Sequence, residues 1–271
     1  IMKLGVIGFG ARITTMIKDI RKQRPGAEIV GYVDPRPVTD EQVAYLGLDR
    51  RPEACPSAED LITRLRPDGL LIGTRCSLHA SYAAEVLPSG IPLFLEKPVA
   101  TTFDDWRMLK EASERHPTPV VVSHPLRLTT MVQLVKEIAD SGVVGTIEHV
   151  QGGNNVPYGG VYYHSWYRDE KETGGLFLQK ATHDFDYINY VLGQPAAGVM
   201  AMTSKQIFKG ARPAGLRCAD CGERRTCPDS TVGTPEEKDW PYCSFAVDTG
   251  NEDSGSALIR YASGMHVSYS Q

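Results

Sequence analysis

The sequence predicts an α/β protein with a doubly wound parallel sheet at residues 1–124 and a second α/β domain at 125–271. Short apolar segments alternate with helical patterns through the first region, as in a βαβ fold. Long strand patterns without intervening helices then follow, which predict an open, mostly antiparallel sheet. A glycine-rich turn between the first strand and the first helix is typical of this kind of fold.

The N-terminal elements follow in a regular order. Apolar strands are expected at 3–8, 28–33, 69–73, 91–95 and 119–124. Between them, helical spacing predicts helices at 11–21 and 78–89, and two more that open at Ser57 and Thr102, each with an aspartate three residues later. Right-handed crossovers would place these helices on both faces of a parallel sheet.

The C-terminal elements are longer and less regular. Helices are expected near 130–141 and 175–192, with a polar, glycine-rich loop at 153–174 between them. Strands are expected near 146–152, 197–207, 254–261 and 264–270, with a cysteine-rich insertion at about 208–245.

Composition narrows the class of protein. The chain has 271 residues, is 41% hydrophobic and 23% charged, and carries a net charge of −4. These values predict a globular protein. They give no sign of the basic surface with which proteins bind nucleic acids or membranes. No apolar run approaches the roughly 18 residues that a membrane helix requires, and no signal-peptide pattern opens the chain. A cytoplasmic location is therefore expected.

The glycine turn predicts a Rossmann dinucleotide site. In "GVIGFGARI", Gly8 allows a tight turn and Gly10 lets a pyrophosphate approach the N-terminus of the next helix. Asp34 follows the second strand, where an acid would bind the adenosine ribose and favour NAD, while Arg36 leaves NADP possible. An ordinary strand–helix turn with a capping acid is the alternative. The cofactor contacts expected here are Gly8, Gly10, Ala11, Arg12, Asp34 and Arg36.

A lysine follows the strand expected at 91–95, in "PLFLEKPVATT". Glu96 and Lys97 are neighbours on a strand and point to opposite faces, so they are not expected to pair with each other. Pro98 fixes the turn, and its peptide bond is a candidate for the cis form. A lysine in a partly dry cleft can take a hydroxyl proton as hydride leaves, although a solvated lysine is the alternative.

The predicted helix "GLFLQKATHDFDYINYVLG" has two faces. Five apolar residues recur at helical spacing: Phe177, Ala181, Phe185, Ile188 and Leu192. The opposite face holds groups that suit hydroxyl binding, namely Gln179, Lys180, His183, Asp186, Tyr187 and Tyr190. This polar face is interpreted as a candidate site, with a simple solvated face as the alternative.

Together these segments resemble the Gfo/Idh/MocA family of NAD(P)-dependent oxidoreductases. The resemblance rests on "GVIGFGAR", "DGLLIGTRCSLHASYA", "PLFLEKPVATT" and "LQKATHDFDYINYVLG", in the family's order. It implies an N-terminal Rossmann domain, a C-terminal sheet that often forms homo-oligomers, and a sugar or polyol substrate.

The resemblance also implies roles for individual residues. Lys97 and His183 match the catalytic pair, and Gln179 stands where relatives often carry an acid, so Lys180 is expected to supply charge. The residues implied to line the cofactor crevice are Thr74, His79, Glu96 and Lys97. Those expected on the substrate side are Arg127, Lys180, His183 and Tyr187.

The segment before this helix offers further substrate contacts. "YGGVYYHSWYRDEKETGG" contains Tyr163, His164, Trp166 and Arg168. Aromatic faces and a guanidinium suit the two sides of a sugar or an acidic group. Packing within the loop is an equally good interpretation.

Four later cysteines suggest a metal site. Cys218, Cys221, Cys227 and Cys243 include one pair at metal-ligand spacing, and four thiolates would complete a closed structural zinc site. A similar cysteine-bearing insertion occurs in one branch of the family. Free or disulfide-forming thiols are the alternative.

Three functions are compatible with the sequence. The leading one is a dehydrogenase that moves hydride between nicotinamide and a carbinol carbon of a sugar, cyclitol or related polyol. The second is an NAD-dependent glycosidase that works by transient C3 oxidation and elimination. The third is a regulator that binds the dinucleotide without catalysis.

Overall fold

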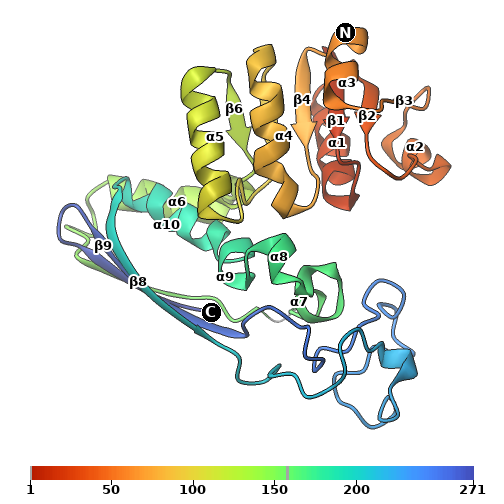
Figure 1. Ribbon diagram of the computed structural model, residues 1–271. Coiled ribbons are helices and arrows are strands. Elements are labelled where there is room, and N and C mark those ends of the chain that lie inside the picture. Colours follow the sequence, from red (N-terminus) through yellow and green to blue (C-terminus); the bar gives the residue numbers. More distant parts are fainter. Residues whose placement is uncertain (1, 157–158) are drawn as a thin grey trace. The chain divides into compact units, whose positions relative to one another are not determined.

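The chain forms two compact units, Ile1–Ser123 and His124–Gln271, each with its own β-sheet. A computed structural model describes residues 2–156 and 159–271 (Figure 1). In these described ranges, none of the helices combines the length and apolar composition needed to cross a membrane.

The first unit contains a six-stranded sheet in the order β3-β2-β1-β4-β5-β6. The strands are β1 (Met2–Ile7), β2 (Ala27–Val33), β3 (Glu53–Ala54), β4 (Gly69–Ile72), β5 (Leu93–Leu95) and β6 (Val120–Val122). All neighbouring strands are parallel. The strand order reverses between β1 and β4, which is where ligands bind in open α/β sheets. The predicted doubly wound sheet is confirmed.

Helices cover both faces of this sheet because successive strand residues point to opposite sides. They are α1 (Ala11–Gln23), α2 (Asp40–Leu46), α3 (Ala58–Leu65), α4 (His79–Val86) and α5 (Phe103–Arg115), with single 3₁₀ turns η1 (Cys76–Leu78) and η2 (Leu87–Ser89). Val6 of β1 packs with Ile13 of α1, whereas the next residue, Ile7, packs with Leu61 of α3. All four of these side chains are fully buried.

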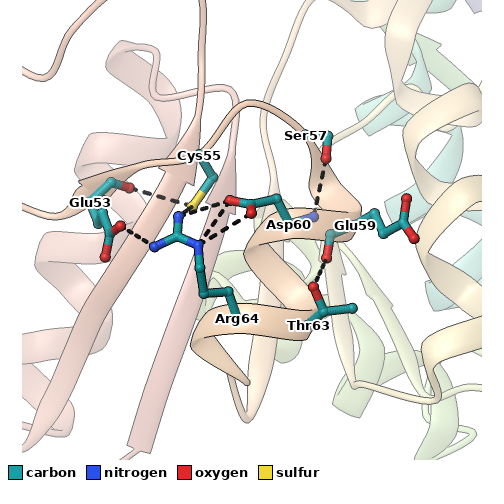
Figure 2. A network of polar contacts seen from close by, with 7 residues as sticks. All are labelled: Glu53, Cys55, Ser57, Glu59, Asp60, Thr63 and Arg64. Atoms are coloured by element: carbon teal, nitrogen blue, oxygen red, sulfur yellow. Dashed lines mark hydrogen bonds and ion pairs between the residues drawn. The ribbon is translucent and has the colours of Figure 1, made fainter.

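Figure 2 shows how α3 is fixed to the edge of the sheet. Ser57 caps the helix by accepting a hydrogen bond from the Asp60 amide, as its spacing in the sequence predicts. The Arg64 guanidinium reaches the Asp60 carboxylate at 2.8 Å and also pairs with Glu53 of β3. The buried Cys55 thiol lies 3.6 Å from the same guanidinium, so it belongs to this packing.

Neither α2 nor β3 was predicted from the sequence. Only Leu46 of α2 is buried, so the helix lacks a clear apolar stripe. It is stabilised instead by a capping box in which Thr39 and Gln42 bond each other's backbone amide. Strand β3 has two residues, too few to show an alternating pattern.

The second unit contains a four-stranded sheet in the order β7-β10-β9-β8. The strands are β7 (His149–Gly153), β8 (Ala196–Ser204), β9 (Ser254–Tyr261) and β10 (His266–Ser270). Only the β7–β10 pair is parallel, so the sheet is mostly antiparallel, as expected. Burial alternates strictly along β9, which gives the sheet one packed and one open face.

The helices η3 (Pro125–Leu128), α6 (Thr130–Asp140) and α10 (Thr182–Leu192) form the helical layer of this unit, and α6 and α10 lie side by side (Figure 1). All five residues of the predicted apolar face contribute to the core between the helices and the sheet. The helix predicted at 175–192 is in fact two, α9 (Leu176–Gln179) and α10, with the break at Lys180 and Ala181.

The predicted loop at 153–174 contains three short helical turns. They are α7 (Val161–His164), η4 (Trp166–Arg168) and α8 (Glu170–Thr173), and another single turn, η5 (Cys218–Asp220), opens the cysteine segment. Such short turns have no full apolar period, so the composition of the segment resembles that of a loop. Positions 157 and 158 of the predicted loop lie outside the described residues.

Candidate functional site

The glycine turn after β1 is closely packed. Gly8 has a φ of +82°, and a Cβ there would lie 2.6 Å from the Thr74 amide nitrogen. Gly10 is the N-cap of α1, and a Cβ at that position would have only the Gly73 oxygen nearby, at 3.8 Å. The first turn of α1 has no acidic residue and no side-chain cap. Its amide groups therefore remain suitable for an anion.

A cavity of about 500 Å³ lies beside this turn. Gly10, Ala11, Asp34 and Arg36 line it, so the structure brings these four predicted cofactor contacts together. The Asp34 carboxylate accepts hydrogen bonds of 2.8 Å from the amides of Phe9 and Arg36. These bonds hold the acid at the end of β2, facing the end of β1.

The end of β5 separates two neighbouring charges. Glu96 is buried and accepts a hydrogen bond of 3.1 Å from Nε of Arg12 on α1. Arg12 is therefore an ion-pair partner of Glu96. The Lys97–Pro98 peptide bond is cis. Lys97 is half-buried and lies on the carboxyl edge of the sheet.

His79, expected to line the cofactor crevice, is buried at the start of α4. Its Nδ1 lies 2.7 Å from the Pro98 oxygen, and its Nε2 lies 3.3 Å from the Thr74 oxygen. Burial lowers the pKa of His79, although the two carbonyl contacts oppose this shift. The ring thus connects the glycine turn, through Thr74, with the Lys97 turn.

In the second unit, the break between α9 and α10 holds the predicted catalytic residues. The Glu252 carboxylate accepts hydrogen bonds from the amides of Leu176 (3.1 Å) and Phe177 (2.6 Å), and so caps the start of α9. Gln179 and Lys180 at the end of α9 are buried, and His183 lies in the first turn of α10. The structure therefore brings Gln179, Lys180 and His183 to one corner.

Two residues accompany His183: Asp186, which belongs to the polar face predicted as a candidate site, and His124, which was not predicted. The Asp186 carboxylate accepts a bidentate pair of hydrogen bonds from Arg127, one of them 2.9 Å long from Nε. His124 packs edge-on against His183, with ring centroids 5.8 Å apart, and its Nδ1 lies 3.9 Å from the Asp186 carboxylate. Arg127, predicted to face substrate, thus has its guanidinium clamped to Asp186. His124 lies two residues after the end of β6, and that position near a strand end was the available signal.

Tyr187 lies where α10 packs on the sheet. Burial, together with the nearby Asp184 carboxylate, raises the pKa of Tyr187 to about 12. Asp184 is itself buried and accepts hydrogen bonds from Asn154 (2.7 Å) and Tyr269 (2.6 Å). Asp184 and its two partners join α10 to the sheet. Contact of Tyr187 with substrate stays a prediction.

The aromatic segment before α9 makes its contacts mainly with other residues of the second unit. The Tyr163 hydroxyl donates to the Glu252 oxygen at 2.9 Å, and Trp166 stacks on Tyr167 with ring centroids 3.9 Å apart. The buried Arg168 guanidinium bonds Asp248 at 2.7 Å and Thr249 at 2.8 Å. This placement agrees with the packing interpretation for the segment.

His164 is also buried, and it anchors the cysteine segment. Its Nδ1 lies 2.5 Å from the Tyr242 oxygen and its Nε2 lies 2.9 Å from the Asp229 carboxylate, which also accepts a hydrogen bond from Ser244. Burial alone would raise the pKa of Asp229, but these hydrogen bonds outweigh that effect and hold the pKa of Asp229 below its usual range. His164 thus holds together parts of the segment that are far apart in sequence.

The predicted zinc site is not supported. All four cysteines proposed as ligands are free thiols. Across the residues that the structure describes, no three or more histidine, cysteine, aspartate or glutamate side chains are arranged to hold a metal ion. The Cys218-x2-Cys221 spacing alone does not establish a metal site. Hydrogen bonds around His164 and Asp229, described above, hold this segment instead.

We expect Asp229→Asn to destabilise the second unit by about 1–2 kcal/mol at neutral pH, because it removes a charge-assisted hydrogen bond. A carboxyl whose pKa is lowered by folding contributes stability above its unfolded pKa and loses it as pH falls through the folded value. The deficit of the variant should therefore shrink below about pH 4. Urea unfolding at several pH values measures this, with exposed Asp239→Asn as control. A deficit that does not depend on pH would contradict the assignment.

Comparisons with known proteins agree with this architecture. Residues 2–144 match the family model described as "Oxidoreductase family, NAD-binding Rossmann fold", and residues 132–271 match "GFO/IDH/MocA C-terminal domain". The myo-inositol 2-dehydrogenase of Lactobacillus plantarum has a similar fold, with a TM-score of 0.70 at 18% identity over 99% of this chain and 69% of that one. The WlbA dehydrogenase of Bordetella pertussis, solved with NADH and UDP-GlcNAcA, gives 0.70 at 23% identity over 99% and 71%.

Among curated proteins, YteT of Bacillus subtilis (strain 168) is 28% identical over 278 residues, which is 90% of this chain and 64% of YteT. The rhizopine catabolism protein MocA of Rhizobium meliloti is 23% identical over 211 residues, 77% of this chain and 63% of MocA. The chain thus spans somewhat less than two thirds of these relatives. Matches to both family models, in order and across both units, show that the chain belongs to the Gfo/Idh/MocA family of oxidoreductases.

Proposed function

We propose that the protein is an NAD(P)-dependent oxidoreductase that transfers hydride between nicotinamide and a carbinol carbon of a sugar, cyclitol or related polyol. The observation that carries this proposal is the arrangement in the first unit. There the tightly packed Gly8 turn, the cavity beside Asp34 and the Lys97 turn all follow strands of one parallel sheet. The family match and inositol dehydrogenases among the relatives support the substrate class.

The residues present fit a dinucleotide. The uncapped start of α1 offers amide donors to a pyrophosphate, and Gly10 leaves room for it because no side chain projects there. Asp34 lines the neighbouring cavity, where its carboxylate would accept hydrogen bonds from ribose hydroxyls. When bound, the nicotinamide supplies the hydride acceptor or donor.

Lys97 is proposed to hold and then remove the proton of the reacting hydroxyl. Its turn is fixed on both sides, since the Glu96 amide donates to the Ile72 oxygen at 3.0 Å and the Pro98 oxygen contacts His79. A general base must be held within hydrogen-bond reach of the proton it takes, and such positioning requires a fixed backbone.

His183 and Lys180 are proposed to share this proton chemistry on the second unit. Gln179 cannot transfer a proton as a carboxylate does, so it is expected only to donate and accept hydrogen bonds. His124 packs against the His183 ring and lies beside the Asp186 carboxylate that pairs with Arg127, so it would help to hold the ring. The side chains of Gln179, Lys180 and His183 are polar groups that suit the hydroxyls of a polyol.

Replacing Asp34 is expected to change cofactor preference. In Asp34→Ser the repulsion of a 2′-phosphate is lost while Arg36 remains, so the ratio of kcat/KM for NAD to that for NADP should fall by about 10-fold or more. Steady-state kinetics with both cofactors measure this ratio. Glu41→Ser, which removes another carboxylate from the same cavity, is the control and should change the ratio little. An unchanged ratio in Asp34→Ser would show that Asp34 does not read the ribose.

A panel of cyclitols, sugars and sugar acids with NAD or NADP tests the function. The proposal expects reduced nicotinamide to accumulate in proportion to oxidised product with at least one of these compounds. A glycosidase of the transient-oxidation type would cleave a glycoside without net accumulation of NADH. Binding of the dinucleotide without any turnover across the panel would favour the regulator.

A homo-oligomer formed through the second sheet is also proposed. The open face and the edge strand β8 expose large apolar side chains, including Val199, Met200 and Met202. Exposed apolar patches of this kind commonly mark protein interfaces. Sedimentation of the protein and of a Met200→Glu variant would test this association.

A further inference from the structure

We propose that His79 is a positioning residue for Lys97, because its buried ring fixes the turn that carries the lysine through the Pro98 carbonyl. This inference rests on the proposed role of Lys97. It replaces the expectation that His79 contacts the cofactor.

The geometry places Lys97 between two anchors. On one side, Glu96 is held by the Ile72 oxygen through its amide and by Arg12 through its carboxylate. On the other side, Pro98 has no amide hydrogen to donate, so its carbonyl is the group through which the backbone can be held. The His79 Nδ1 reaches that carbonyl at 2.7 Å, a short and favourable distance.

The protonation state of His79 decides which of its two carbonyl contacts can be a hydrogen bond donated by the ring. Burial lowers the pKa of His79, so the ring is neutral near pH 7 and carries one ring hydrogen. The contact of Nδ1 with Pro98 is 2.7 Å, whereas that of Nε2 with Thr74 is 3.3 Å. We assign the hydrogen to Nδ1 on these distances. The neutral ring then donates to the Lys97 turn.

Two substitutions separate this hydrogen bond from simple packing. The side-chain nitrogen of asparagine lies near the position of Nδ1, and that of glutamine lies near the position of Nε2. His79→Asn therefore retains a donor toward Pro98, while His79→Gln directs its donor toward Thr74. A misplaced catalytic group can cost about 100-fold in rate.

We expect His79→Asn to keep kcat within about threefold of the wild type and His79→Gln to lose roughly 10- to 100-fold. KM for the dinucleotide should change by less than about twofold in both, because neither variant touches the Asp34 cavity. Circular dichroism and thermal unfolding confirm that each variant is folded. Equal loss in both variants, or a larger loss in His79→Asn, would overturn the proposal, since packing alone does not distinguish the two amides.

A second measurement does not depend on turnover. Lysines are reductively methylated with ¹³C, and the Lys97 signal is assigned by its absence in Lys97→Arg. The signal and its titration should change in His79→Gln and remain close to wild type in His79→Asn. If the panel of substrates shows no turnover, the proposed function fails, yet this spectrum still decides whether His79 positions Lys97. An identical Lys97 signal in the wild type, His79→Asn and His79→Gln would overturn the inference.

Discussion

Replacing Lys97 with alanine is expected to lower kcat by about 10³-fold while the Kd for NAD changes by less than about threefold. General acid–base groups typically contribute rate factors of about 10²–10⁴, and the alanine variant has no group to take the hydroxyl proton. The dinucleotide is expected to bind mainly through the Gly8 turn and the Asp34 cavity, which this substitution leaves in place. Steady-state kinetics and fluorescence titration of the cofactor measure the two quantities.

Two further variants refine this test. Lys97→Arg keeps the positive charge but cannot release a proton near neutral pH, so it should be nearly as slow as Lys97→Ala. Lys110→Ala removes an exposed lysine on α5 and should leave kcat unchanged. Substantial activity in Lys97→Arg would mean that charge, rather than proton transfer, is the contribution of the residue. Full activity in Lys97→Ala would remove it from the mechanism.

Replacing Gly8 with alanine is expected to abolish dinucleotide binding and to destabilise the first unit by about 2–4 kcal/mol. A Cβ at Gly8 would lie within 2.7 Å of three atoms of Thr74, two of which belong to its backbone. Backbone atoms cannot rotate away, so the turn itself must shift. That shift would displace the amides at the start of α1 and the Thr74 oxygen that contacts His79.

The cost of the left-handed backbone can be separated from the cost of the clash. Gly90→Ala in the same unit has a φ of +69° with no heavy atom within 4 Å of the added Cβ. It should lose only about 1 kcal/mol and bind NAD normally. Urea unfolding and cofactor titration of both variants give the comparison. Equal losses in the two would show that the packing of Gly8 against Thr74 is not important.

The doubly wound sheet was predictable because its signals are local. Strands covered on both faces are continuously apolar, as in β4, and helix starts such as Ser57 carry their capping residue in the sequence. The apolar face of α10 was likewise visible in its spacing. Gly10 could be predicted because one short motif includes a strand end, a turn and a helix start, and Asp34 because it follows the second strand.

The remaining contacts join residues that are far apart in the chain. Arg127 and Asp186 lie 59 residues apart, and His164 and Tyr242 lie 78 apart, so neither pair has a local signature. The family resemblance placed Arg127 on the substrate side, and its guanidinium made Arg168 a candidate for a sugar or an acidic group, but the structure pairs them with Asp186 and Asp248. Isolated cysteine spacing had the same weakness, because it cannot show whether four thiols converge on one point.

Transfer of deuterium from a polyol to the cofactor tests the central claim most directly. The protein is incubated with NAD and myo-inositol or glucose that carries deuterium on its carbon atoms, and the cofactor is analysed by mass spectrometry. Hydride transfer from a carbinol carbon predicts one deuterium at C4 of the nicotinamide for each molecule of carbonyl product formed, and transfer that is about 10³-fold slower in Lys97→Ala. Ketone formation with an unlabelled reduced cofactor would contradict direct hydride transfer.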